Sequence, residues 1–127
     1  MSTPRVRPVL VLAALLIAAS VVATDAVAGD REAPARATKV VRAVVSHWSP
    51  TTVRISRGDT IRWRAVSGSH TVTAYGRGWR FNKSLSTGDV AARAFRRAGT
   101  FRFRCTIHST LTDGRCSGMC GKVVVRS

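Results

Sequence analysis

The most informative stretch of this chain reads Thr100-Phe101-Arg102-Phe103-Arg104-Cys105-Thr106-Ile107-His108. Polar and apolar residues alternate over its first six positions, which is the period of a strand that buries one face. This pattern places Phe103 and Cys105 on the apolar face and leaves the arginines in water. The strand therefore directs the Cys105 thiol inward, and His108 follows three residues later. A thiol and an imidazole at this spacing form half of a site for a soft metal ion.

The same two-residue alternation recurs along most of the chain after residue 50. It predicts strands at 53–55, 61–65, 70–74, 101–105 and 122–126. Turns rich in Gly, Pro and Asp separate these segments, and short strands divided by such turns are typical of a β-sandwich or barrel. Residues 89–97 contain alanines that could begin a helix. We interpret this segment as a strand because Phe95 stands just before the Ala98-Gly99 turn.

The other half of the metal site is expected from His70 and Met119. His70 shares the inward face of its strand with Val72, so its ring should point toward the end of the sandwich. A core histidine bonded to a neighbour is the alternative, and the nearby Cys105/His108 pair favours a ligand. Two imidazoles, one thiolate and one weak thioether are the ligand set of a blue-copper site. The chain supplies that set once.

A structural zinc site is the rival interpretation. Cys105, His108, Cys116 and Cys120 would offer three sulfurs and one nitrogen, a set found in closed tetrahedral zinc sites. That set would leave His70 and the methionine without a role. It would also crowd four ligands into one segment of a chain otherwise rich in strands. These two features favour copper over zinc.

Residues 1–28 have the three parts of a secretory signal peptide. A basic start precedes an uncharged run from Val9 to Ala23, and Ala26-Val27-Ala28 supplies the small residues of a cleavage site after Ala28. An uncleaved membrane anchor is the alternative, although the run is shorter than the roughly 20 residues that a bilayer needs. We expect a flexible lead-in at 29–37 and one folded domain at 38–127. The protein is then exported, and is periplasmic, bound to the cell envelope or secreted.

The chain is strongly basic, with a formal net charge of +15 at pH 7. Such a charge suits acidic partners, anionic surfaces or nucleic acid, and the export signal argues against nucleic acid. Five arginines occupy outward positions of the predicted strands: Arg54, Arg62, Arg64, Arg102 and Arg104. We interpret them as solvated faces, with a docking surface for an acidic partner as the alternative. Trp79 and Phe81 are expected to pack under a loop, and a basic-aromatic contact surface is the alternative there.

Four segments together resemble the plastocyanin/azurin-type cupredoxins. They are Arg57-Gly58-Asp59-Thr60-Ile61-Arg62-Trp63, Ser69-His70-Thr71-Val72, Ala98 to His108, and Gly118-Met119-Cys120-Gly121-Lys122-Val123. The resemblance spans about residues 38–127 and implies an all-β Greek-key β-sandwich of about seven to eight strands. It further implies one mononuclear type I copper, with His70, Cys105 and His108 in the plane and Met119 on the axis. The edge of His108 would be the point where electrons leave.

Two departures from the family pattern concern the surroundings of the ligands. Many members have Asn after the first ligand histidine, whereas this chain has Thr71, so Thr71 and Thr106 are the candidates for supporting the ligands. The ligand loop is also long, with ten residues between His108 and Met119. If Cys105 binds copper, an exported protein can pair its other two cysteines in a disulfide, Cys116–Cys120. Free or intermolecular thiols are the alternative.

The function that follows is that of an exported type I copper protein carrying single electrons. We expect a monomer that works with a redox partner protein, possibly an acidic one, binds no nucleic acid and meets a membrane only through an uncleaved N-terminal segment. With three histidines and six acidic residues in all, the chain leaves little for a second copper centre or for acid/base catalysis, so we do not expect an enzyme. Copper delivery in the cell envelope with the same ligands is the alternative. A metal-free interaction domain is a third hypothesis.

Overall fold

The computed structural model describes Pro4 and residues 33–127. These residues form nine strands in two sheets and contain no helix. Within the same part of the chain, no helix is long and apolar enough to cross a membrane. The predicted signal peptide at 1–28 lies outside the described residues apart from Pro4, as does the start of the lead-in.

The nine strands build two facing sheets. The first has the order β2-β1-β4-β7, with bounds His47–Ser49, Thr38–Val44, Thr60–Ala65 and Val90–Ala94. The second has the order β3-β9-β8-β5-β6, with bounds Thr52–Ser56, Arg115–Arg126, Gly99–Thr112, His70–Tyr75 and Asn82–Leu85. The predicted all-β sandwich is confirmed, with nine strands where seven to eight were expected. The predicted strand at 89–97 is confirmed over Val90–Ala94, which is β7.

The core lies between the inner faces of the two sheets. The alternation predicted for β8 is confirmed, because Phe101, Phe103 and Cys105 are buried there. Phe103 packs edge-on against Trp63 of the opposite sheet, with ring centroids 5.3 Å apart. The same row of inward residues that fills the core thus ends in the thiol.

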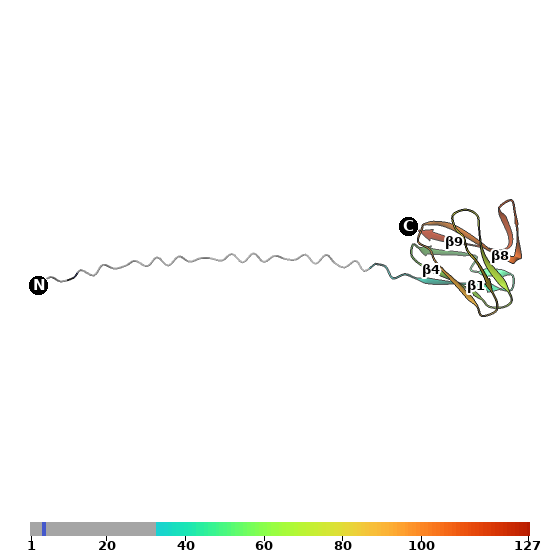
Figure 1. Cartoon of the computed structure of the whole chain (residues 1–127), viewed down its shortest axis with the longest axis horizontal. Helices are drawn as coiled ribbons and strands as arrows, with labels where there is room; N and C mark the ends of the chain where they lie inside the picture. The colour runs from blue at the N-terminus through green and yellow to red at the C-terminus, as the bar shows by residue number, and fades with distance from the viewer. Residues whose placement is uncertain (1–3, 5–32) are drawn as a thin grey trace. The chain divides into compact units, whose positions relative to one another are not determined.

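Strand β8 and strand β9 form the longest pairing in the molecule. They run antiparallel from Gly99↔Val125 to Thr112↔Arg115. Figure 1 shows the C-terminus at one end of the sandwich and the tip of this hairpin at the other. Cys105 directly follows the last pair before the register shift, Arg104↔Cys120, and therefore lies toward the end opposite the C-terminus.

Asp59 fastens the start of β1 to the turn before β4. Its carboxylate accepts hydrogen bonds from the backbone N–H groups of Ser56 at 2.9 Å and Ala37 at 2.8 Å. These two bonds, with the charge of Lys39, hold the pKa of Asp59 below its ordinary value despite the opposing effect of burial. The bonds therefore stabilise the folded state most strongly when the carboxylate is charged.

We expect the Asp59→Asn variant to lose less stability on acidification than the wild type. A lowered folded-state pKa gives stability that is present above the unfolded pKa, about 4, and is lost as pH falls through the folded value. Urea unfolding at pH 7 and at pH values below 4 measures this difference. Asp113→Asn, in an exposed turn, is the control. Equal acid sensitivity of Asp59→Asn and wild type would contradict the assignment.

Candidate metal site

The candidate site occupies an interruption in the β8–β9 pairing. Arg104 pairs with Cys120 and Ser109 pairs with Gly118, so four residues of β8, 105–108, face the single residue Met119 of β9. This bulge turns Cys105 and His108 toward each other instead of alternating them across the sheet. It brings three of the four predicted ligands onto one pair of strands.

Three of the predicted ligands converge in space. One donor atom from each of His70, Cys105 and His108 lies within 4.8 Å of the others. The Cys105 Sγ is 3.4 Å from Nδ1 of His108 and 3.9 Å from Nδ1 of His70. His70 and Cys105 are fully buried and His108 is half-buried. The site is thus enclosed except at the ring of His108.

The orientation of His70 is set by the backbone. Its Nε2 lies 2.7 Å from the carbonyl oxygen of Ser67. Because a carbonyl only accepts, Nε2 is the nitrogen that donates to Ser67, and the other nitrogen, Nδ1, faces the Cys105 sulfur. A histidine whose second nitrogen is held in this way has its ligand nitrogen fixed in advance.

Thr71 links the two segments that carry the donors. Its backbone N–H donates to the Cys105 sulfur at 3.4 Å. Its hydroxyl accepts from the backbone N–H of Thr106 at 2.8 Å and lies 3.0 Å from the Thr106 hydroxyl. Thr71 therefore ties the segment after the first histidine to the segment after the cysteine, at the place where the family pattern has Asn.

We expect Thr71→Val to destabilise the protein by about 1 kcal/mol, because it leaves the Thr106 N–H without its acceptor while keeping the side-chain shape. This corresponds to a fall in Tm of about 5 °C. Thr71→Ser keeps the hydroxyl and is the matched control. Thermal unfolding and amide exchange at Thr106 measure the effect. Identical behaviour of the two variants would show that the hydroxyl does not matter.

Met119 is buried next to the cluster. It is 1% exposed, and its backbone carbonyl accepts a hydrogen bond of 3.1 Å from the Trp48 indole. The Trp48 ring is in turn 6.4 Å from the ring of His70. Trp48, on the short strand β2, thus positions the backbone of the predicted axial residue from the opposite sheet.

The ten residues between His108 and Met119 form a β-hairpin. Beyond the bulge, β8 and β9 pair again from Ser109↔Gly118 to Thr112↔Arg115. The turn is Asp113-Gly114, with φ values of 49° and 75°, the type of two-residue turn that such sequences favour. The long segment is therefore ordered by its own hydrogen bonds.

The predicted disulfide between Cys116 and Cys120 is confirmed. The two Cα atoms are 6.1 Å apart, whereas four residues of a straight strand would span about 13 Å. Strand β9 is therefore sharply bent between them, at Gly118 and Met119. Because both sulfurs are bonded to each other, neither is available as a thiolate, and the alternative zinc set is wrong.

Sequence reasoning missed several groups that support the site. The Trp48 indole contacts a residue 71 positions away in the chain, and the Ser67 carbonyl lies three residues before His70. Arg104 was expected in water, but it is half-buried and its guanidinium donates to the carbonyl and hydroxyl of Ser109. The Ser109 hydroxyl also donates to the carbonyl of Cys105. These bonds close the bulge, and no local pattern predicts them.

Solved structures with the same fold include amicyanins and a cupredoxin. The amicyanin from Paracoccus versutus (Thiobacillus versutus) is 26% identical, with a TM-score of 0.57 over 75% of this chain and 86% of that one. A purple cupredoxin from Nitrosopumilus maritimus is 22% identical, with a TM-score of 0.54 over 68% and 98%. A Cu-containing nitrite reductase (NirK) from Thermus scotoductus SA-01 is 19% identical, with a TM-score of 0.56 over 75% of this chain but 23% of that one. Neither a protein-family model nor a curated protein matches the sequence. The fold and the His-Cys-His cluster confirm the resemblance to the cupredoxins.

Proposed function

We propose that this chain is a type I copper protein that carries single electrons between redox partners. The observation that carries the proposal is the convergence of the His70, Cys105 and His108 donor atoms within 4.8 Å of one another, beside the buried Met119. This donor set fits copper, because thiolate and thioether suit the monovalent ion and imidazole suits both oxidation states. Hard oxygen ligands, which magnesium or calcium would require, do not belong to the cluster.

The protein prepares each donor before any ion arrives. The Cys105 thiol has to give up its proton to bind a metal, and the N–H of Thr71 donates to the sulfur that would carry the charge. His70 presents a lone pair at Nδ1 because Ser67 holds its other nitrogen. These fixed groups limit rearrangement when the charge of the site changes, which favours rapid electron transfer. Copper, when bound, supplies a one-electron couple between its monovalent and divalent states.

His108 is the proposed route for electrons. It is the one half-buried member of the cluster, whereas His70 and Cys105 are fully buried. Ile107, beside it, is 58% exposed and gives that end of the molecule an apolar contact. A redox partner that covers this end would approach the ring of His108. The positive charge of the chain favours an acidic partner.

We further propose that the protein acts as an exported monomer and performs no catalysis by itself. The amicyanins among the similar structures support a carrier, and the nitrite reductase matches over only 23% of its length. The disulfide supports an oxidising compartment such as the periplasm, the cell envelope or the exterior. The N-terminal residues 1–28 would serve as the export signal.

The visible spectrum of the copper-loaded protein tests this function. An intense thiolate-to-copper charge-transfer band with reversible one-electron reduction is the expected result. Tight copper binding without such a band, together with transfer of the ion to an acceptor protein, would instead indicate copper delivery. Absence of stoichiometric copper binding would refute both.

Met119→Leu is expected to keep the colour and to raise the reduction potential. Leucine removes one electron-pair donor and leaves the three other donors in place, and the loss of a donor destabilises the more highly charged divalent ion more than the monovalent one. Spectroscopy and protein-film voltammetry of the two proteins measure the change. Val123→Leu, a core change elsewhere on β9, is the control. An unchanged potential in Met119→Leu would show that another group occupies the axial position.

A further inference from the structure

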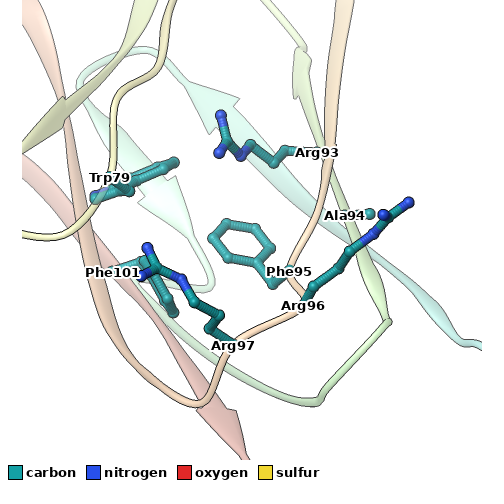
Figure 2. Close-up of a pocket in the computed structure, with 7 residues that line it drawn as sticks. All are labelled: Trp79, Arg93, Ala94, Phe95, Arg96, Arg97 and Phe101. Atoms are coloured by element: carbon teal, nitrogen blue, oxygen red, sulfur yellow. The ribbon is translucent and has the colours of Figure 1, made fainter.

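A pocket lies at the end of the sandwich away from the metal site. Its position follows from β8, where Phe101 stands four residues before Cys105, a distance of about 13 Å along the strand. The pocket has a volume of about 400 Å³, within the range of small-molecule sites. It is lined by Trp79, Arg93, Ala94, Phe95, Arg96, Arg97 and Phe101 (Figure 2).

The floor of this pocket is aromatic. The rings of Trp79, Phe95 and Phe101 contact one another, with centroids 5.6 Å apart for Trp79–Phe95, 6.0 Å for Trp79–Phe101 and 5.1 Å for Phe95–Phe101. All three residues are buried, and the Trp79 indole donates to the carbonyl of Arg102 at 3.0 Å. The predicted packing of Trp79 under a loop is thus correct. The small exposed parts of these rings give the pocket a fixed apolar floor against which another flat group can pack.

Two arginines are held in place at the rim. Arg93 donates from Nη1 to the carbonyl of Arg80 at 2.8 Å, and Arg97 donates from Nη2 to the carbonyl of Gly78 at 2.7 Å. The Arg93 guanidinium also lies 5.8 Å from the centre of the Trp79 ring. Figure 2 shows Arg93 reaching toward Trp79 and Arg97 extending beside Phe101, while Arg96 points away from Trp79. A guanidinium has five N–H donors, so each of the two anchored groups keeps donors for a ligand.

The positive charge of the pocket has no partner among its own lining residues. The acidic residues in the described part of the chain are Asp59, Asp89 and Asp113, and none of them lines the pocket. Asp59 and Asp89 accept backbone hydrogen bonds in turns, and Asp113 lies in the turn of the β8–β9 hairpin. The two fixed guanidinium groups lie above an aromatic floor and have no carboxylate of the protein beside them. Such groups are suited to binding an anion from solution.

We infer that this pocket binds a small organic anion that carries a flat apolar ring. The anionic group would take the free N–H donors of Arg93 and Arg97, and the ring would lie on Trp79 and Phe95. Because both guanidiniums are already anchored, binding orders little more of the protein. The inference does not depend on copper and concerns a different part of the molecule.

Titration of the purified protein with benzoate, followed by amide and indole NMR signals, tests the inference. We expect saturable shifts centred on the Trp79 indole and on residues 93–101. We expect weaker binding of acetate, which lacks the ring, and of benzyl alcohol, which lacks the charge. Arg93→Gln and Arg97→Gln should each weaken benzoate binding by about tenfold. Arg62→Gln, an exposed arginine of β4 outside the pocket, should leave it unchanged.

Several results would overturn the inference. One is benzoate binding that does not saturate, and another is equal weakening by Arg62→Gln and the pocket variants, which would indicate general charge attraction. Acetate binding as tightly as benzoate would refute the role of the aromatic floor. If a pocket variant does not fold, the NMR signals that benzoate shifts in the wild type still show where it binds. Shifts centred on the hairpin or on the β3–β9 edge would then reject the pocket.

Discussion

Cys105→Ser is expected to abolish the intense visible band of the copper-loaded protein and to lower its copper affinity by more than about 100-fold. That loss exceeds the range typical for removal of an outer partner, because this change removes a donor atom itself. A serine hydroxyl does not ionise as a thiol does, and the charge-transfer band requires a thiolate on the metal. The Thr71 N–H, 3.4 Å from the sulfur, would face a neutral serine hydroxyl instead of a thiolate. Absorption spectra and competition with a copper chelator measure both effects.

The matched control removes the other two cysteines. In the Cys116→Ser/Cys120→Ser variant the disulfide is lost but Cys105 remains, so the band should persist. A thiol assay on the unfolded metal-free wild type should find one free sulfhydryl. An intense band that survives in Cys105→Ser and disappears in the double variant would reverse our assignment of the thiolate ligand.

Gly118→Ala is the second change with a large expected effect. Gly118 has a φ of 98°, a conformation that is unfavourable for alanine. An added Cβ would also collide with the carbonyl oxygen of His108 and lie 3.1 Å from the Cα of Ser109. Since both contacts are to backbone, the bulge that carries His108 has to shift. We expect a loss of about 2–4 kcal/mol in the free energy of unfolding, with weaker copper binding.

Gly114→Ala separates the strain of a positive φ from the collision of the added Cβ. Gly114 also has a positive φ, 75°, but no atom lies within 4 Å of the position its Cβ would take. This variant should lose only about 1 kcal/mol, and its copper affinity should equal that of the wild type. Chemical unfolding and copper titration of both variants give the comparison. If the two alanines cost the same, the close approach between Gly118 and His108 has no role in the site.

The alternation around Phe103 made most of the fold predictable. Burial of every second residue specifies which face of a strand meets the core, and this information is local. It correctly oriented Cys105 and His70, and the same local spacing put His108 beside the thiol. The pattern missed three strands: β2 and β6 carry too few residues for a reliable period, and β1, although seven residues long, buries only Val41 and Ala43 fully.

The support of the site was harder to predict because it depends on pairs of residues far apart in the chain. Trp48 and Met119 are separated by 71 positions, and Thr71 and Thr106, which the family resemblance had singled out, are separated by 35. The Asp113-Gly114 turn is the one local sign that β8 and β9 pair again after the bulge at 105–108. The alternation of Phe101 to Cys105 stops there, so the segment looks like an irregular loop. Its order comes from the predicted disulfide and from cross-strand hydrogen bonds, and those hydrogen bonds are displayed only by the folded chain.

The renewed pairing beyond the bulge has a consequence for protein engineering. Cys105, His108 and Met119 lie between the core of the sandwich and the pair Ser109↔Gly118, which begins the outer part of the hairpin. Asp113-Gly114 is at the tip of that outer part. Residues inserted at that tip would lengthen the outer part of the β8–β9 hairpin without moving the donor atoms. The tip is therefore a natural insertion point for a recognition peptide or an electrode linker, held within a few residues of the exposed edge of the site.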